Sequence, residues 1–284
     1  MKRKRIWKII GRNKSVVVGI LIIFFFVIMA VFAVQISPYD PHLRTGKAYE
    51  EPSASHWLGT NDIGQDILSE IIYGTRVSMV IGVFSALLSV AFGTILGMLA
   101  GYYQGFWDMV VRGLTNIMMS VAGLPLTLFL VAVLGSGTKN MIMIICITGW
   151  VGTARVIRTK VMQLREQPFI KIEQMMGVHS LRILFAHILP NILDMVLFRF
   201  AMAVGSSILM ESSLSFLGLG TYGEKSWGNV LHFAFYRGAL LRNEYWWYLP
   251  PIICISLCML GFTLLTHRGM NREGLRKGEA DASD

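Results

Sequence analysis

The chain has 284 residues, of which 54% are hydrophobic and 15% charged, and its formal net charge is +9. Soluble domains have roughly 25% charged residues, so this composition excludes an ordinary soluble protein and indicates an integral membrane protein. The basic residues flank apolar segments instead of forming one basic domain, and we therefore expect the lipid bilayer, and no nucleic acid, as a partner.

Six apolar segments are long enough to cross a bilayer, whose hydrocarbon core of about 30 Å needs about 20 helical residues. In the fourth, the apolar run is short and gives way to Arg155 and Arg158. We predict an all-α membrane protein with six transmembrane helices, at about residues 15–36, 77–101, 113–134, 140–157, 192–219 and 247–266.

Lys and Arg are concentrated on one set of the predicted loops. That set holds 18 of the 26 basic residues, the opposite set holds seven, and Arg199 lies inside a span. Because cytoplasmic loops carry an excess of Lys and Arg, both termini and the loop after the fourth span are predicted to be cytoplasmic. The first span exceeds the 7–15 apolar residues typical of a cleaved signal peptide, although VFA at 31–33 resembles a processing site.

The segment between the first two spans is rich in turn residues, and we expect a loop with one short helix at residues 63–73. His56, Asp62 and Asp66 could be metal ligands, but a solvated cap is the favoured interpretation. Cys254 and Cys258 share a helix face without His or carboxylate neighbours, which favours packing. We expect no metal site.

Glycines occur at two places in the second and third spans. Gly93, Gly97 and Gly101 lie four residues apart, which predicts a stripe for close helix packing. Gly123 and Pro125 predict a kink inside the third span, either for packing or along a substrate path.

The fifth span contains Asp194, Arg199 and Glu211, and ionisable residues inside membrane helices are functional candidates. We favour interfacial charges for them, with Glu211 near the outer boundary. Ser206, Ser207 and Glu211 remain the candidates for lining a transport pathway.

An amphipathic loop separates the fourth and fifth spans. Pro168 suits the first turn of a helix with an apolar stripe, Gly177 then turns the chain, and Ser180 is a plausible N-cap for a second short helix. Pro190 is expected to end that helix and Asn191 to open the next span. The stripes are Phe169, Ile172, Met175 and Met176, then Leu181, Leu184, Phe185 and Ile188. Such stripes can lie on lipid, under the spans or in a groove of a partner.

Several motifs resemble those of one transporter family. The pattern Gly177, Ile183, His187 and Leu189-Pro190-Asn191 resembles the cytoplasmic "EAA" loop of permeases of binding-protein-dependent ABC importers. Four further stretches resemble the second, C-type permease of the dipeptide, oligopeptide and nickel group: HWLGTNDIGQDILSEIIYGTRVS, GMLAGYY, ESSLSFLGLG and WGNVL.

The resemblance implies a type I ABC importer permease fold with a coupling helix seated in a cytoplasmic ATPase. It also implies a sister permease, two ATPase subunits or domains, an extracytoplasmic substrate-binding protein, and the bacterial inner membrane as location. By this resemblance the ATPase-coupling residues are Lys171, Glu173, Gly177, Ser180, Ile183, His187, Pro190 and Asn191. Because no G-x-x-x-x-G-K-[ST] motif occurs, this chain should bind no cofactor, with ATP and Mg²⁺ used by the partner ATPase.

The chain departs from the family at three positions. Lys171 replaces the glutamate of Glu-Ala-Ala, and Asn61 and Gln65 replace the usual Asp and Arg. Because Lys171 has the opposite charge, a salt bridge from this position to the ATPase cannot be assumed from the family. The change indicates that the facing surface of the ATPase is adapted to a lysine.

We therefore expect a permease subunit, inactive alone. An intramembrane enzyme would need paired catalytic groups at depth, and a standalone carrier would need midplane relays or an inverted repeat; neither pattern occurs. Dipeptides, oligopeptides, nickel and metal chelates all remain possible substrates. The predicted organisation is 1–36 (cytoplasmic N-terminus and first helix), 37–75 (extracytoplasmic loop), 76–268 (transmembrane domain with coupling loop 158–191) and 269–284 (cytoplasmic tail).

Overall fold

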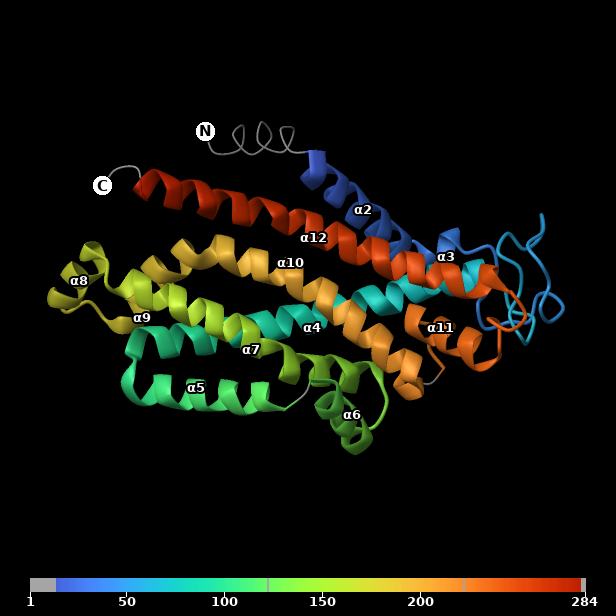
Figure 1. The fold of residues 1–284 in the computed structure, drawn as a ribbon, viewed down its shortest axis with the longest axis horizontal. Coiled ribbons are helices and arrows are strands. Elements are labelled where there is room, and N and C mark those ends of the chain that lie inside the picture. The colour runs from blue at the N-terminus through green and yellow to red at the C-terminus, as the bar shows by residue number, and fades with distance from the viewer. Residues whose placement is uncertain (1–13, 122, 222, 282–284) are drawn as a thin grey trace.

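Long helices running in one general direction make up most of the molecule (Figure 1). The computed structural model describes residues 14–121, 123–221 and 223–281, with side chains in the last range as far as Thr266. Its elements are α2 (Lys14–Val31), α3 (Ala33–Ile36), α4 (Ile67–Tyr103), α5 (Gly105–Ser120), α6 (Gly123–Leu134), α7 (Thr138–Arg165), α8 (Pro168–Met175), α9 (Ser180–Arg182), the π-helical η1 (Ile183–Ile188), α10 (Leu189–Leu214), the π-helical η2 (Ser215–Leu219), α11 (Trp227–Tyr236) and α12 (Tyr245–Asp281).

Five segments of the described chain are long and apolar enough to span a membrane, and the bent pair α5–α6 makes a sixth if it is counted as one span. The five lie at Lys14–Val31, Ile67–Tyr103, Thr138–Arg165, Ser180–Leu219 and Tyr245–Thr266. The prediction of a helical membrane protein is therefore confirmed, with five spans, or six if α5 and α6 form one broken span. The basic cluster expected between residues 2 and 12 lies outside the described residues, as do the side chains of the tail 269–284.

Helix α4 is longer than the predicted second span. Asp66 caps it, because its side chain accepts a hydrogen bond from the backbone N–H of Ser69. At 1.5 Å per residue, its 37 residues extend for about 55 Å. The separate short helix predicted at residues 63–73 is wrong, since residues from Ile67 onward are already the first turns of α4.

The third span is broken. Helices α5 and α6 are bent by 93° to each other, and the break precedes Gly123. Pro125 lies in the first turn of α6, where a missing backbone N–H costs no helical hydrogen bond. The bend falls where glycine and proline predicted it, but it separates two helices instead of kinking one.

The prediction that Pro190 ends a helix is wrong. Helical structure runs without a break from Ser180 through η1 into α10, and Pro190 lies in the first turn of α10. The wider π-helical turns of η1 come directly before it, and such turns relieve the clash of a proline ring with the preceding turn. The side-chain amide of Asn191 donates to the carbonyl oxygen of His187 at 2.7 Å and satisfies that acceptor.

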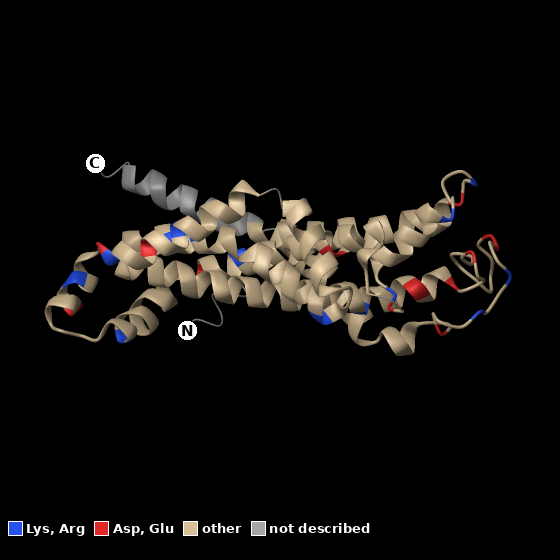
Figure 2. Cartoon of the chain, turned by 90° about the horizontal axis from the view of Figure 1, so that it is seen from below, with Lys and Arg blue, Asp and Glu red and all other residues tan. Residues whose placement is uncertain are grey.

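Helix α4 lies at the centre and packs against α7, α10, α5 and α2, while α12 packs against α2 and α10. Charged residues gather toward the two ends of the bundle (Figure 2). One end carries α8, and the other carries α11 and the outer segment, residues 37–66 (Figure 1). These two ends are called the α8 end and the outer end below.

Candidate functional site: the elbow at the α8 end

Helix α8 projects at the α8 end and is anchored there by one apolar side chain. Pro168 occupies its first turn, as predicted from the sequence. Ile170 is completely buried in a cluster with Ile183 and Ile188 from η1 and Ile157 from α7. The apolar stripe predicted from the sequence for this helix did not include Ile170, although the side chain of Ile170 fixes α8 to the spans.

The opposite face of α8 is uncovered. Met175 is 88% exposed and Met176 75%, and Phe169 and Ile172 are also exposed. Methionine is flexible and polarizable, so such a face suits a surface that packs against a partner. The second predicted stripe is divided, because Leu184 and Ile188 are buried whereas Leu181 and Phe185 are exposed.

Gly177 turns the chain between α8 and α9, and we call residues 176–179 the elbow. Its φ angle is +74°, in the left-handed region that L side chains rarely adopt. No atom lies within 4 Å of the position that a Cβ would take. Glycine is therefore required by the backbone conformation and not by lack of space.

A contact between a carboxylate and an imidazole joins the two arms of the elbow. Glu173 of α8 lies 3.0 Å from Nε2 of His187 in η1, and the backbone N–H of Val178 donates to the carbonyl of Glu173 at 3.1 Å. The structure therefore brings together three predicted residues, Glu173, Gly177 and His187. Ser180 does not cap the second helix; His179 does, with its Nδ1 accepting from the N–H of Leu181 at 3.4 Å.

Lys171 takes no part in this contact and forms an ion pair with Glu166. Its Nζ lies 2.8 Å from the Glu166 carboxylate, and both side chains are largely exposed. The hydrogen bond and the positive charge from Lys171 lower the pKa of Glu166. Lys171, at the position where the resemblance leads us to expect a glutamate, therefore has an internal partner.

Gly93, Gly97 and Gly101 lie on the face of α4 that meets α7. A Cβ on these glycines would lie 2.6 Å from the carbonyl oxygen of Trp150, 2.7 Å from that of Ala154 and 2.7 Å from that of Arg158, respectively. Because real Cβ atoms do not approach backbone so closely, the two helices could not pack this tightly with larger residues.

The three pathway candidates lie in the outer half of α10, away from the elbow. Ser206 is exposed, Ser207 is buried, and Glu211 is completely buried. The Glu211 carboxylate accepts hydrogen bonds from Ser78 at 3.0 Å and from Ser215 at 2.8 Å. Glu211 is thus enclosed by hydroxyls, one of them from the neighbouring helix α4.

At the outer end, a network that the sequence did not reveal surrounds Glu70. Lys225 lies 2.5 Å from the Glu70 carboxylate and 2.7 Å from the side-chain oxygen of Gln65. Asn61 also donates to Glu70, at 3.0 Å. Asn61 and Gln65 therefore belong to one network: Asn61 donates to Glu70, and Gln65 accepts from Lys225, which lies 160 residues further along the chain.

The suspected metal ligands of the outer segment serve separate purposes. His56 Nδ1 lies 2.9 Å from Asp66, whereas Asp62 pairs with Arg237 at 2.9 Å. No group of three His, Cys, Asp or Glu side chains suited to a metal ion occurs in the described part of the chain.

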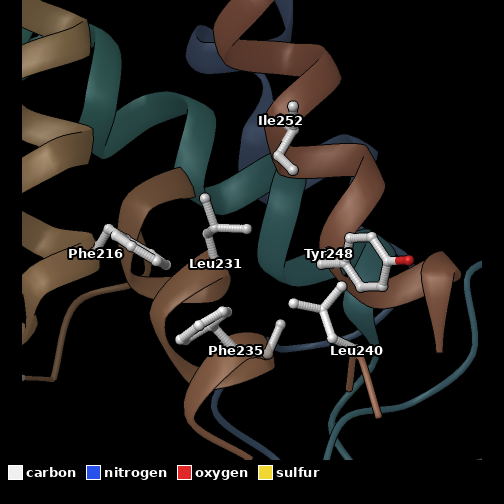
Figure 3. A pocket seen from close by; sticks show the side chains of 7 residues that line it. Phe216, Leu231, Phe235, Leu240, Tyr248 and Ile252 are labelled. Carbon is white, nitrogen blue, oxygen red and sulfur yellow. The ribbon is translucent and has the colours of Figure 1, made fainter. Parts of the chain in front are cut away.

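A small apolar pocket of about 240 Å³ also lies at the outer end. Figure 3 shows Phe216, Leu231 and Phe235 converging on it with Leu240, Tyr248 and Ile252. The pocket has no polar group positioned for chemistry, and it lies far from the elbow along the bundle (Figure 1).

The sequence matches a known family of membrane proteins. The model of the binding-protein-dependent transport system inner membrane component matches residues 93–272, more than half of the chain. This chain belongs to that permease family. A second model, the N-terminal TM domain of oligopeptide transport permease C, matches residues 3–54 of the permease.

The permease is also similar to characterised relatives along most of its length. It is 34% identical to the dipeptide transport system permease protein DppC of Alkalihalophilus pseudofirmus over 91% of this chain and 85% of the relative. It is 35% identical to the oligopeptide permease OppC of Bacillus subtilis, over 89% and 83%, and 33% identical to the glutathione permease GsiD of Pectobacterium atrosepticum, over 92% and 87%.

Among solved structures, the inward-facing MetNI methionine ABC transporter is similar in fold, with a TM-score of 0.53, 16% identity, and coverage of 70% of this chain and 94% of that chain. The permease is therefore the membrane subunit of a binding-protein-dependent ABC importer with the type I fold. It is a transporter subunit and not an enzyme; its ATPase is a separate subunit, and a substrate-binding protein is the other general partner of the family.

Proposed function

We propose that this permease imports peptides, including dipeptides, oligopeptides or glutathione-like peptides, across the bacterial inner membrane. The proposal is supported by three relatives, a dipeptide, a glutathione and an oligopeptide permease, which match along most of their length. The nickel and metal-chelate alternatives have no corresponding support among these relatives.

We further propose that the working complex contains a sister permease, two ATPase subunits and an extracytoplasmic binding protein. The α8 end faces the cytoplasm in this arrangement, with both termini on that side. The excess of Lys and Arg on the corresponding loops supports this orientation. The permease itself holds no cofactor, and ATP with Mg²⁺ is bound by the ATPases.

Coupling to the ATPase is assigned to α8 and the elbow. Met175 and Met176 present an uncovered apolar face, whereas Ile170 and the Glu173–His187 contact fix α8 to η1 and α7. A helix that is tightly attached on one face and free on the other can transmit a displacement from a partner to the spans. This combination is the observation that carries the proposal.

A backbone substitution at the elbow tests the coupling role. Replacing Gly177 with a β-branched residue, Gly177→Val, forces a side chain into the left-handed region at a cost of about 1–2 kcal/mol. We expect the complete transporter, reconstituted in proteoliposomes, to lose most labelled-dipeptide uptake and most substrate-stimulated ATP hydrolysis. The amount of permease in the membrane should stay unchanged, because the site has open space.

The matched control is Gly177→Asn, since asparagine tolerates the left-handed conformation, and it should retain most uptake. Full uptake by Gly177→Val would refute the coupling role. Normal ATP hydrolysis without dipeptide uptake in the unmodified complex, together with import of another solute, would instead refute the peptide assignment.

A further inference from the structure

A polar groove separates α5 from α7 on the half of the bundle nearest the α8 end. It encloses about 300 Å³. Its polar lining comes from both helices and consists of Arg112, Thr115, Asn116, Arg155, Arg158 and Thr159. Three arginines, one asparagine and two threonines therefore line one space, and coupling by the elbow uses none of them.

The positive charge of this groove is only partly neutralised. Asp108 forms a bidentate ion pair with Arg158 and also lies 3.1 Å from Nε of Arg112. No carboxylate lies within ion-pair distance of Arg155 among the described residues, and its side chain is exposed. Asp108 therefore pairs with two of the three arginines, and three positive charges against one negative charge leave the groove a net charge of about +2.

Helix contacts show that the groove lies close to the end of the spans. Gly97 approaches the carbonyl of Ala154, and Gly101 that of Arg158, only two residues before α4 ends at Tyr103. Exposed aromatic rings mark the same level at the α4–α5 turn, where Tyr103, Phe106 and Trp107 are 42–67% exposed. Exposed aromatic residues at helix ends are typical of the membrane–water interface, so the groove lies at the depth of lipid headgroups.

We propose that this groove binds the headgroup of an anionic phospholipid. Arginine matches phosphate oxygens with paired N–H donors, and basic pockets between spans near the membrane surface suit anionic headgroups. Outside the groove lining, α5 exposes Met109, Leu114 and Ile117, on which acyl chains can lie. The interfacial depth and this apolar neighbour favour a lipid over the carboxylate of a transported peptide.

Lipid binding can be measured on the complete transporter by native mass spectrometry, titrated with dioleoylphosphatidylglycerol and, separately, dioleoylphosphatidylcholine. We expect the unmodified complex to prefer the anionic lipid. Arg155→Gln should weaken binding of the anionic lipid about tenfold, the effect of losing one charge-assisted contact, with little change for the zwitterionic lipid. Arg112→Gln provides a second variant and should weaken binding in the same direction.

The matched control is Lys160→Gln, which removes one positive charge from the same helix outside the groove lining. An equal loss in Lys160→Gln, or equal affinity for both lipids, would overturn the proposal. Two competition results would also overturn it: glycerophosphoglycerol binding as tightly as the lipid, which would indicate a soluble-anion site, and displacement of the lipid by a dipeptide, which would indicate a peptide site.

Discussion

Glu244, at the start of α12, is a buried carboxylate without a full set of partners. Its side chain is 6% exposed, and its Oε2 atom has no hydrogen-bond partner in the described structure. Burial raises the pKa of Glu244, and the positive charge of Arg242 lowers it by a smaller amount. With a raised pKa, the folded state binds the proton more tightly than the unfolded state. Ionised Glu244 therefore costs stability above the folded-state pKa, and this cost disappears as the pH falls through that value.

The amide substitution Glu244→Gln should therefore stabilise the permease at neutral and alkaline pH. We expect a gain of about 1 kcal/mol in the free energy of unfolding near pH 8, declining toward zero as the pH is lowered. Thermal unfolding of the purified complex over a pH series measures the effect. Glu224→Gln, at an exposed position, is the control and should give no such dependence. A gain that is independent of pH would show that the charge of Glu244 is not responsible.

Single residues differ in how far sequence could predict them. Gly177 could be found because few residue types besides glycine tolerate the required φ angle, and His187 because it belongs to a recognisable motif. The role of Lys225 could not be predicted from the sequence, because its partner Glu70 lies 155 residues away and no local pattern joins them. Ile170 looked like any other apolar residue of a short helix, and its burial depends on packing against η1 and α7.

Among the elements, the α4–α7 pair depends most directly on small residues. A Cβ at Gly97 would lie 2.7 Å from the carbonyl oxygen of Ala154 and 2.9 Å from Cβ of Ile157. Both neighbours belong to the body of α7 and cannot rotate away. Any side chain at Gly97 must therefore push the two helices apart along their contact.

The smallest such change, Gly97→Ala, should lower the free energy of unfolding by about 1–3 kcal/mol, as overpacking does elsewhere. Gly113→Ala in α5 is the matched control, because no atom lies within 4 Å of its Cβ position and alanine favours helix. Melting of the two purified complexes side by side measures the difference. Equal melting temperatures would show that α4 and α7 are not held at this close distance.

Element boundaries were predictable where composition changes sharply, and less so where the helix geometry adapts. The six spans follow from hydropathy, because bilayer thickness fixes their length. The continuation past Pro190 depends on the π-helical turns of η1, for which the sequence has no simple pattern. The 93° bend between α5 and α6 was indicated by glycine and proline, but its size depends on the surrounding helices.

At the scale of the whole molecule, the Lys225–Glu70 pair ties distant parts of the outer end together. Glu70 lies in the first turn of α4, and Lys225 in the segment before α11. Their side chains are 4% and 16% exposed, so each charge depends on the other for compensation. Asn61 extends the network into the outer segment.

Removing one partner of this pair should therefore lower the free energy of unfolding by more than the intact pair contributes to it. Lys225→Met leaves Glu70 buried without its cation, and we expect a loss of about 3–5 kcal/mol in the free energy of unfolding. The double variant Lys225→Met with Glu70→Gln should recover part of that loss, because it removes the uncompensated charge as well. Thermal unfolding of the purified complex and protease sensitivity of residues 37–66 are the measurements. If the double variant is as unstable as the sum of the two single variants, the residues do not interact energetically and the outer segment is held by other contacts.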